Sequence, residues 1–278
     1  MTRHEGHGHR SRAVPLFGLN TVQGTASRMA LLLAVFIGIP VNLLAEPKHE
    51  ETLAQKLLRQ YRQIESASCD VRRDVTTSEG SIRWLSRVYF RQSNQLHAAN
   101  AAPLPRLIIA DGTMMYQHQS GAERGFRRLI ADLDINMRIN LERVPGTLME
   151  HLIRLKDTPE IELNSSPEAA IRRAYDAEHV YAILEVDEQY RLHRMLFYNA
   201  QDQTKKTGKI RCESFQEVLP KVWIAMQHSA SFYLGENTVR ERTRFTNYEV
   251  NIPIPEDTFS PDAHYADDIE WVDSFDQL

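Results

Sequence analysis

Hydrophobic and polar positions alternate over much of the chain, and the alternation is interrupted by two segments of helical spacing. In residues 53–64, apolar side chains recur three or four positions apart, which predicts one amphipathic helix. From Cys69 onward the period changes to two. Between residues 82 and 91 one set of alternate positions is largely apolar, and the other carries three arginines. This pattern is typical of a strand with one buried and one hydrated face.

Turn residues divide the rest of the alternating pattern into further strands. Asp111-Gly112 lies between the apolar runs 107–110 and 113–116, and such a dipeptide is the strongest short signal for a hairpin. After Pro159, strands are expected at 181–186, 192–198, 209–218, 222–231 and 239–250. The following prolines of NIPIPEDTFSP cannot donate to a strand ladder, so an extended exit is expected there.

A helical insertion is predicted over residues 126–155, where apolar residues return to helical spacing. Pro145-Gly146 breaks it into two pieces. The inward face of the second piece is marked by Val144, Leu148, Leu152 and Leu155. The element order predicts an α+β domain over residues 46–262: one meandering antiparallel sheet of about 10–11 strands, curled around helices that cover one face.

The chain's 278 residues carry a formal net charge of −4, which is unevenly distributed. Residues 1–45 contain four arginines and one glutamate, and their last seventeen residues, from Met29, are uncharged. This is the layout of a secretory signal peptide, with cleavage expected after Ala45. An uncleaved N-terminal membrane anchor is the alternative.

Eight acidic residues and no basic ones lie between Glu256 and the C-terminus, and residues 263–278 are therefore expected to form an acidic tail. The body between these ends is nearly neutral, which argues against a nucleic-acid-binding protein. Export would permit a disulfide between the two cysteines, Cys69 and Cys212. The alternative, which we favour, is that the two thiols are buried separately.

Catalytic and metal-binding motifs do not occur in the sequence. There is no G-x-S-x-G elbow, no H-E-x-x-H pair and no glycine-rich phosphate loop, and the histidines are scattered. We therefore expect no catalytic residues, no cofactor and no metal, and a protein that is not an enzyme. A hydrolase assembled from residues distant in sequence is the alternative that remains.

Four stretches of the chain resemble the periplasmic lipoprotein-carrier (LolA/LolB-like) superfamily. They are QKLLRQYRQIESASCDVRRDV, GSIRWLSRVYFRQSNQLHAAN, LIIADGTMMYQHQ and the ending KVWIAMQ…TRFTNYEVNIPIPEDTFSP. The chain has Arg91-Gln92 where carriers of the family often have Arg-Pro, and its helical insertion is longer. These departures indicate a divergent member.

The resemblance implies an incomplete antiparallel β-barrel whose concave apolar face is covered by helices. Between sheet and helical lid it implies a cavity that holds an acyl chain. The residues expected to line this cavity are Ile82, Trp84, Val88, Phe90, Ile108, Met114, Tyr116, Leu148, Leu152, Leu196 and Trp223. The alternative is that these residues form a filled core.

Arginines supply the remaining candidates. Arg87 and Arg91 are expected to contact the lid or an anionic headgroup, or else to be solvated residues of an outer face. A basic surface that could dock an acidic partner is expected at Arg83, Arg124, Arg127 and Arg128.

The function that these features imply is that of an exported, monomeric, non-enzymatic carrier or binding protein for a lipid or lipoprotein acyl chain. Its place would be the periplasm of the cell envelope, where an inner- or outer-membrane protein would be its partner. The alternative is an envelope sensor or regulatory interaction module on the same fold.

Overall fold

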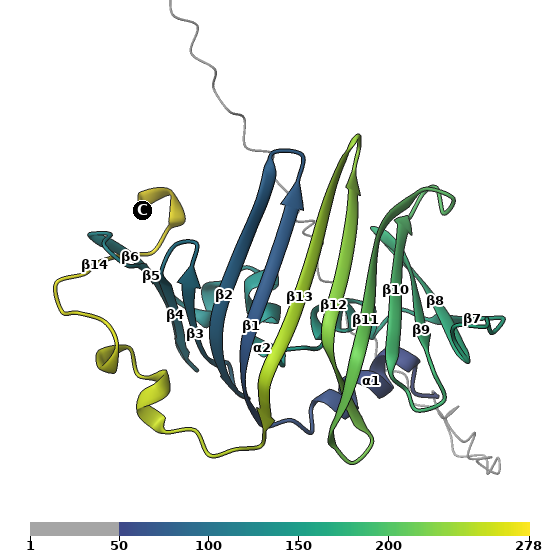
Figure 1. Cartoon of the computed structure of the whole chain (residues 1–278), viewed down its shortest axis with the longest axis horizontal. Coiled ribbons are helices and arrows are strands. Elements are labelled where there is room, and N and C mark those ends of the chain that lie inside the picture. The colour runs from purple at the N-terminus through teal and green to yellow at the C-terminus, as the bar shows by residue number, and fades with distance from the viewer. Residues whose placement is uncertain (1–49) are drawn as a thin grey trace, which may run out of the picture. The chain divides into compact units, whose positions relative to one another are not determined.

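Fourteen β-strands form one continuous sheet in the computed structural model, which describes residues 50–278. Their order is β14-β6-β5-β4-β3-β2-β1-β13-β12-β11-β10-β9-β8-β7, from left to right in Figure 1. All neighbouring strands are antiparallel except β14 and β6, which are parallel. The signal peptide expected over residues 1–45 lies outside the described residues.

Along the chain, the strands fall into two groups, one before and one after the helical segment at residues 135–155. The first group is β1 (Ser66–Thr77), β2 (Gly80–Arg91), β3 (Gln95–Ala102), β4 (Arg106–Asp111), β5 (Met114–Gln119) and β6 (Arg124–Leu129). The second is β7 (Glu160–Leu163), β8 (Ile171–Ala177), β9 (Val180–Val186), β10 (Leu192–Asn199), β11 (Lys206–Leu219), β12 (Val222–Leu234) and β13 (Asn237–Val250). The short β14 (Glu270–Val272) follows near the C-terminus.

The sheet is an open, incomplete barrel. Pairing of β1 with β13 joins the two groups at its centre, and β14 and β7 are its two edges. The architecture is the expected one, with more strands than the predicted ten or eleven. Five had no predicted range: β3, β6, whose apolar spacing had been interpreted as the start of a helix, and the short or charged strands β7, β8 and β14.

Three helices pack on one face of the sheet, which we call the inner face; the opposite one is the outer face. They are α1 (Leu53–Tyr61), α2 (Ile135–Glu142) and α3 (Met149–Leu155). Side chains of α1 and α3, such as Leu57 and Leu152, join one buried cluster with Phe90, Met195 and Ile224 of the sheet. A second cluster places Leu141 of α2 with Met115 and Phe126 of β5 and β6.

Helix α1 begins with a capping box. Thr52 accepts a hydrogen bond from the Gln55 amide, and the Gln55 side chain accepts one from the Thr52 amide. The helix is also held to the second strand group, because the Ala54 amide donates to the Tyr175 hydroxyl at 3.0 Å. The Gln55 side chain further donates to the Lys156 carbonyl at 2.8 Å, which connects α1 to the end of α3.

The turn between α2 and α3 lies against the sheet and holds both helices in place. The Tyr248 hydroxyl donates to the Pro145 carbonyl. Gly146 adopts a φ of +80°, and a Cβ added there would lie 2.7 Å from Ile224 Cγ2. The sequence predicted a break at Pro145-Gly146, and the structure confirms it. Glycine is required here both for its backbone angle and for the close approach.

Substituting Gly146 with alanine should destabilise the fold by about 2–4 kcal/mol, because backbone strain is added to a clash with Ile224. Gly121→Ala is the matched control. Gly121 has a φ of +83° with nothing within 4 Å of an added Cβ, so only the strain of about 1–2 kcal/mol should appear. Urea unfolding measures the free energy of unfolding of both variants. An equal loss of stability in the two would contradict the tight contact between Gly146 and Ile224.

The acidic C-terminal segment runs along the outer face of β3 to β6 as far as Trp271. Its end reaches the inner face, where Phe275 stacks on Phe126 with the ring centroids 4.0 Å apart. The prolines lead into short 3-10 turns at Glu256–Phe259 and Pro261–Ala263, and another follows at Phe275–Gln277. The residues after 262, which had been expected to form an acidic tail, thus contribute β14 to the sheet.

Arg91 anchors this segment. Its guanidinium donates to Glu256 at 2.7 Å and to the Ile254 carbonyl, and it lies 4.9 Å from the centre of the Phe259 ring. Nearby, the Tyr265 hydroxyl donates to the Leu107 carbonyl at 3.0 Å. The segment is therefore fastened by polar contacts at several points along the outer face.

Replacing Arg91 with glutamine should release the segment, since it removes charge-assisted hydrogen bonds worth about 1–3 kcal/mol. A glutamate-specific protease should then cut at Glu256 and Glu270 faster than in the parent protein. Arg59→Gln is the control, because its ion pair with Glu51 is exposed and worth about 0–1 kcal/mol. Unchanged cleavage in Arg91→Gln would contradict the anchoring role.

Candidate functional site

The inner face beneath α1 and α3 is the most extensive apolar surface that the described residues bury. Its strands contribute Ala67 and Cys69 of β1, Phe90 of β2, and a run of side chains on β9 to β13. Because side chains alternate along a strand, these residues form rows that cross the sheet. The two helices complete this cluster from the other side.

A pocket of about 200 Å³ opens where α1, α2 and the β2–β3 turn meet. The buried residues Phe90, Val144 and Met149 line it on the apolar side. Arg62 and Glu142 line it as well, together with the polar turn Gln92, Ser93 and Asn94. Small-molecule sites usually measure about 300–1,000 Å³. The present arrangement of the helices thus leaves a pocket that is smaller than a typical ligand site. This pocket has an apolar wall and a charged rim.

Seven of the eleven predicted lining residues belong to the inner face or to its helices. Phe90, Leu148 and Leu152 lie in the main core, which is the buried cluster between the sheet and helices α1 and α3, and Val88 packs against it. Ile108 packs against the second cluster beneath α2. Ile82 and Trp84 share the face of Phe90 by strand alternation, but Ile82 is 51% exposed.

The other four predicted residues face outward. Met114 and Tyr116 flank Met115, whose side chain points inward to the second cluster, so their own side chains meet the C-terminal segment instead. Leu196 belongs to a separate outer cluster with Ala174 and Ile183. Trp223 lies between the buried Val222 and Ile224, and the Arg191 guanidinium is 5.2 Å from its ring.

Arg87 and Arg91 also lie on the outer face. Arg87 donates to Asp70 at 3.1 Å and lies 5.0 Å from the Tyr89 ring centre. Arg91 holds the C-terminal segment, as described above. Their contacts therefore match the outer-face interpretation, and not contact with the helical lid.

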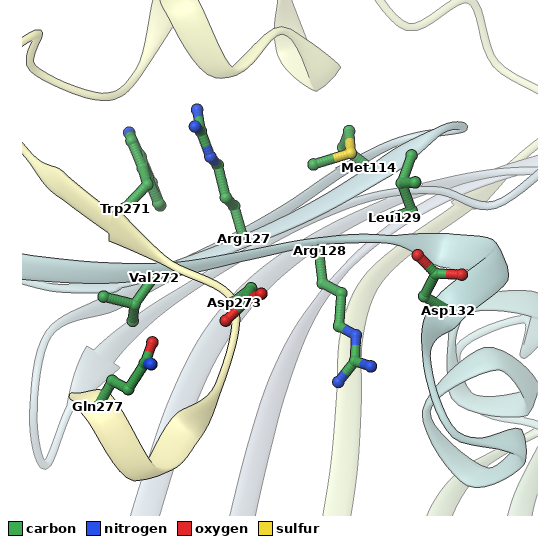
Figure 2. Close-up of a pocket in the computed structure, with 9 residues that line it drawn as sticks. All are labelled: Met114, Arg127, Arg128, Leu129, Asp132, Trp271, Val272, Asp273 and Gln277. Carbon is green, nitrogen blue, oxygen red and sulfur yellow. The ribbon is translucent and has the colours of Figure 1, made fainter.

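The predicted basic surface is divided in the structure. Arg83 pairs with Asp74 at 2.6 Å, while Arg124 pairs with Glu270 at 3.1 Å. Arg127 and Arg128 line a pocket of about 520 Å³ between β6 and the C-terminal residues. Figure 2 shows Arg127 and Trp271 on one side of β6, with Arg128 on the other.

The acidic C-terminal segment supplies much of the opposing charge at this edge. Asp273 lines the same pocket as the two arginines, as does Asp132 from the start of the helical insertion. The chain itself therefore contributes both signs of charge there, which weakens the case for a purely basic docking surface.

Cys69 and Cys212 are both buried and unpaired. They lie on β1 and β11, which are separated by β13 and β12. Three strand spacings amount to about 14 Å, and a disulfide needs Cα atoms within about 7 Å. Burial raises the pKa of each thiol to about 12. The structure therefore contains two separate, unreactive thiols.

A polar group that the sequence did not single out lies beside the core. The side chain of His228 of β12 is partly buried, its inaccessible Nε2 atom has no hydrogen-bond partner, and burial lowers its pKa to about 4. One carboxylate oxygen of Glu150 is likewise buried without a partner, while the other pairs with Arg143 at 3.0 Å. Sequence gives no signal for this because the two residues lie on different elements.

The described residues also limit the chemistry of the site. Between residues 50 and 278 no three His, Cys, Asp or Glu side chains gather closely enough to bind a metal ion. No helix in that range has the length and apolarity needed to cross a membrane.

Comparison with solved structures identifies the architecture. A LolA superfamily protein from Nitrosomonas europaea aligns with a TM-score of 0.50 and 13% identity, covering 75% of this chain and 98% of its own. The fold is LolA-like. A putative outer membrane lipoprotein-sorting protein domain from Vibrio parahaemolyticus gives 0.51 and 11%, covering 76% and 95%.

A DUF1329 family protein from Desulfovibrio piger shares the LolA-like fold as well, with a TM-score of 0.50, 10% identity and coverage of 76% and 95%. No family model matches the sequence, and neither does any curated protein. The likeness confirms the expected fold.

A thiol titration tests the description of the two cysteines. We expect a thiol-specific reagent to leave both unmodified in the native protein, because both are buried and protonated at neutral pH. In urea without reductant both should react. Absence of reaction in urea would reveal a disulfide and contradict the structure.

Proposed function

We propose that this protein is an exported, non-enzymatic carrier that binds the acyl chain of a lipid or lipoprotein between the inner face and helices α1 and α3. The proposal places it in the periplasm, as a monomer that uses no cofactor. The LolA-like fold supports it, since one protein of this fold is described as a lipoprotein-sorting domain. Transfer of that role to this chain is part of the proposal.

The observation that carries the proposal is the way the apolar inner face is covered. Two short helices, of nine and seven residues, pack on it in place of a second sheet. Helices of this length are marginal on their own and depend on packing. They can therefore shift as units at lower cost than a strand, whose ladder hydrogen bonds would have to break.

The energetics favour an exchange of one apolar partner for another. Each buried methylene contributes about 0.8 kcal/mol, so a chain of about sixteen carbons contributes on the order of 10 kcal/mol. Moving the helices exposes side chains such as Leu152 and costs free energy of the same kind. The net affinity is then the difference, which suits a carrier that must also release its cargo.

The pocket beside Phe90 is the proposed point at which a chain begins to insert. Its apolar wall of Phe90, Val144 and Met149 leads directly into the main core. Its rim carries Arg62 and Glu142, which can contact the polar end of a ligand. This orientation would leave the headgroup in water and the acyl chain beneath the helices.

The experiment combines lipid detection with a blocked pocket. Protein purified without detergent is examined by native mass spectrometry for bound lipid, and a fluorescent long-chain fatty acid is titrated. Glu142→Trp places a large ring on the exposed rim, where it should leave folding intact. We expect its affinity for the probe to fall at least about tenfold, or about 1.4 kcal/mol.

Glu178→Trp is the matched control, since Glu178 is exposed in the turn between β8 and β9. Its affinity should stay within about twofold of the parent protein. If the protein carries no lipid and shows no saturable probe binding, the carrier proposal fails. If the lipid-free protein then captures an envelope protein, the alternative of an envelope sensor or regulatory module on the same fold is favoured.

A further inference from the structure

A second pocket, of about 330 Å³, lies on the outer face of β8 to β11. Its charged side chains lie on the opposite face of the sheet from the proposed acyl site, because they alternate with residues of the inner face such as Leu184 and Met195. Leu196 and Ile210 supply its apolar lining. Five cationic side chains line it: Arg172, Arg194, Lys206, Lys209 and Arg211. One carboxylate, that of Glu185, shares the lining.

Glu185 organises the two innermost arginines. It is only 1% exposed, and it stands directly opposite Arg172 on β8 and Arg194 on β10. Arg172 donates to one carboxylate oxygen at 2.9 Å, and Arg194 donates to the other. A buried carboxylate needs such partners, so the pairing fixes both guanidinium groups. Arg172 is further held by the Asn164 carbonyl at 3.1 Å.

Fixing the guanidinium groups does not use up their donors. A guanidinium has five N–H groups, and Glu185 accepts only one from each arginine. Outside the pocket wall, Arg194 also meets Glu168, and Arg211 pairs with Glu213 at 3.0 Å. The carboxylates of Glu185, Glu168 and Glu213 reduce the positive charge of the pocket, but the five cationic side chains still outnumber them.

The two lysines supply that excess. Lys206 and Lys209 are exposed, and in the described part of the chain neither forms an ion pair; the Lys206 ammonium lies 5.6 Å from the Tyr198 ring centre. Two fixed guanidinium groups beside two exposed ammonium groups match the charge and the several acceptor oxygens of a phosphate.

We propose that this pocket binds a phosphate group. The basic surface continues beyond it, since Arg211 lies across β12 from Arg242 of β13. Arg240, Arg242 and Arg244 alternate along β13 on the same outer face, and all three are exposed. A phosphate with this chemistry has two sources, a lipid headgroup in a membrane surface and a free phosphate compound, and the test distinguishes them.

The test uses the full chain and two probes. Pyrophosphate is titrated by calorimetry, and binding to vesicles of phosphatidylcholine with or without phosphatidylglycerol is measured by sedimentation. We expect Lys206→Gln/Lys209→Gln to weaken binding of the responding probe at least about tenfold. These exposed substitutions avoid the buried Glu185, whose loss would endanger folding.

Arg127→Gln/Arg128→Gln on β6 is the control, because it removes the same charge from a different surface. The affinity of this control variant for the responding probe should remain within about twofold of that of the parent protein. Binding of pyrophosphate supports the site with a free phosphate compound as its source, and binding only to phosphatidylglycerol vesicles supports it with a lipid source. Absence of both, or an equal loss in the control, would overturn the proposal.

Discussion

The structure depends on covering one apolar face of an open sheet. A fourteen-stranded sheet with free edges at β14 and β7 cannot bury that face by closing on itself. The packing of α1 and α3 against rows that include Phe90, Met195 and Ile224 solves this problem. Because the cover consists of short helices, its stability comes from the same apolar contacts that an acyl chain would replace. Stability and the proposed binding are therefore two uses of one surface.

The two faces of the sheet differ in chemistry because side chains alternate along every strand. On the outer face, the acidic C-terminal segment covers β3 to β6, and Arg91 fastens it. At the other end of the same face, the cations around Glu185 remain uncovered. The small formal charge of −4 thus conceals a separation of charge across one surface. This separation gives the molecule an apolar inner site and a charged outer one.

Much of the fold follows from sequence pattern, whereas the sites do not. The helix at α1, the Asp111-Gly112 hairpin and the break at Gly146 each have a local physical cause that sequence displays. The direction of Met114 and Tyr116 was wrong, because the register of that hairpin pairs Met115 with the inward-facing Ala110 and so turns the neighbours of Met115 outward. Glu185 gave no signal within the apolar run of β9, since its partners Arg172 and Arg194 meet it only through strand register.

The central claim is that ligand binding exchanges helix contacts for acyl contacts on the inner face. Hydrogen exchange of the protein with and without a long-chain fatty acid measures this directly. Amides of α1, α3 and the turn at Gly146 should change their exchange rates on binding, while the central pair β1 and β13 should not. An unchanged pattern in the helices at saturating fatty acid would contradict the claim.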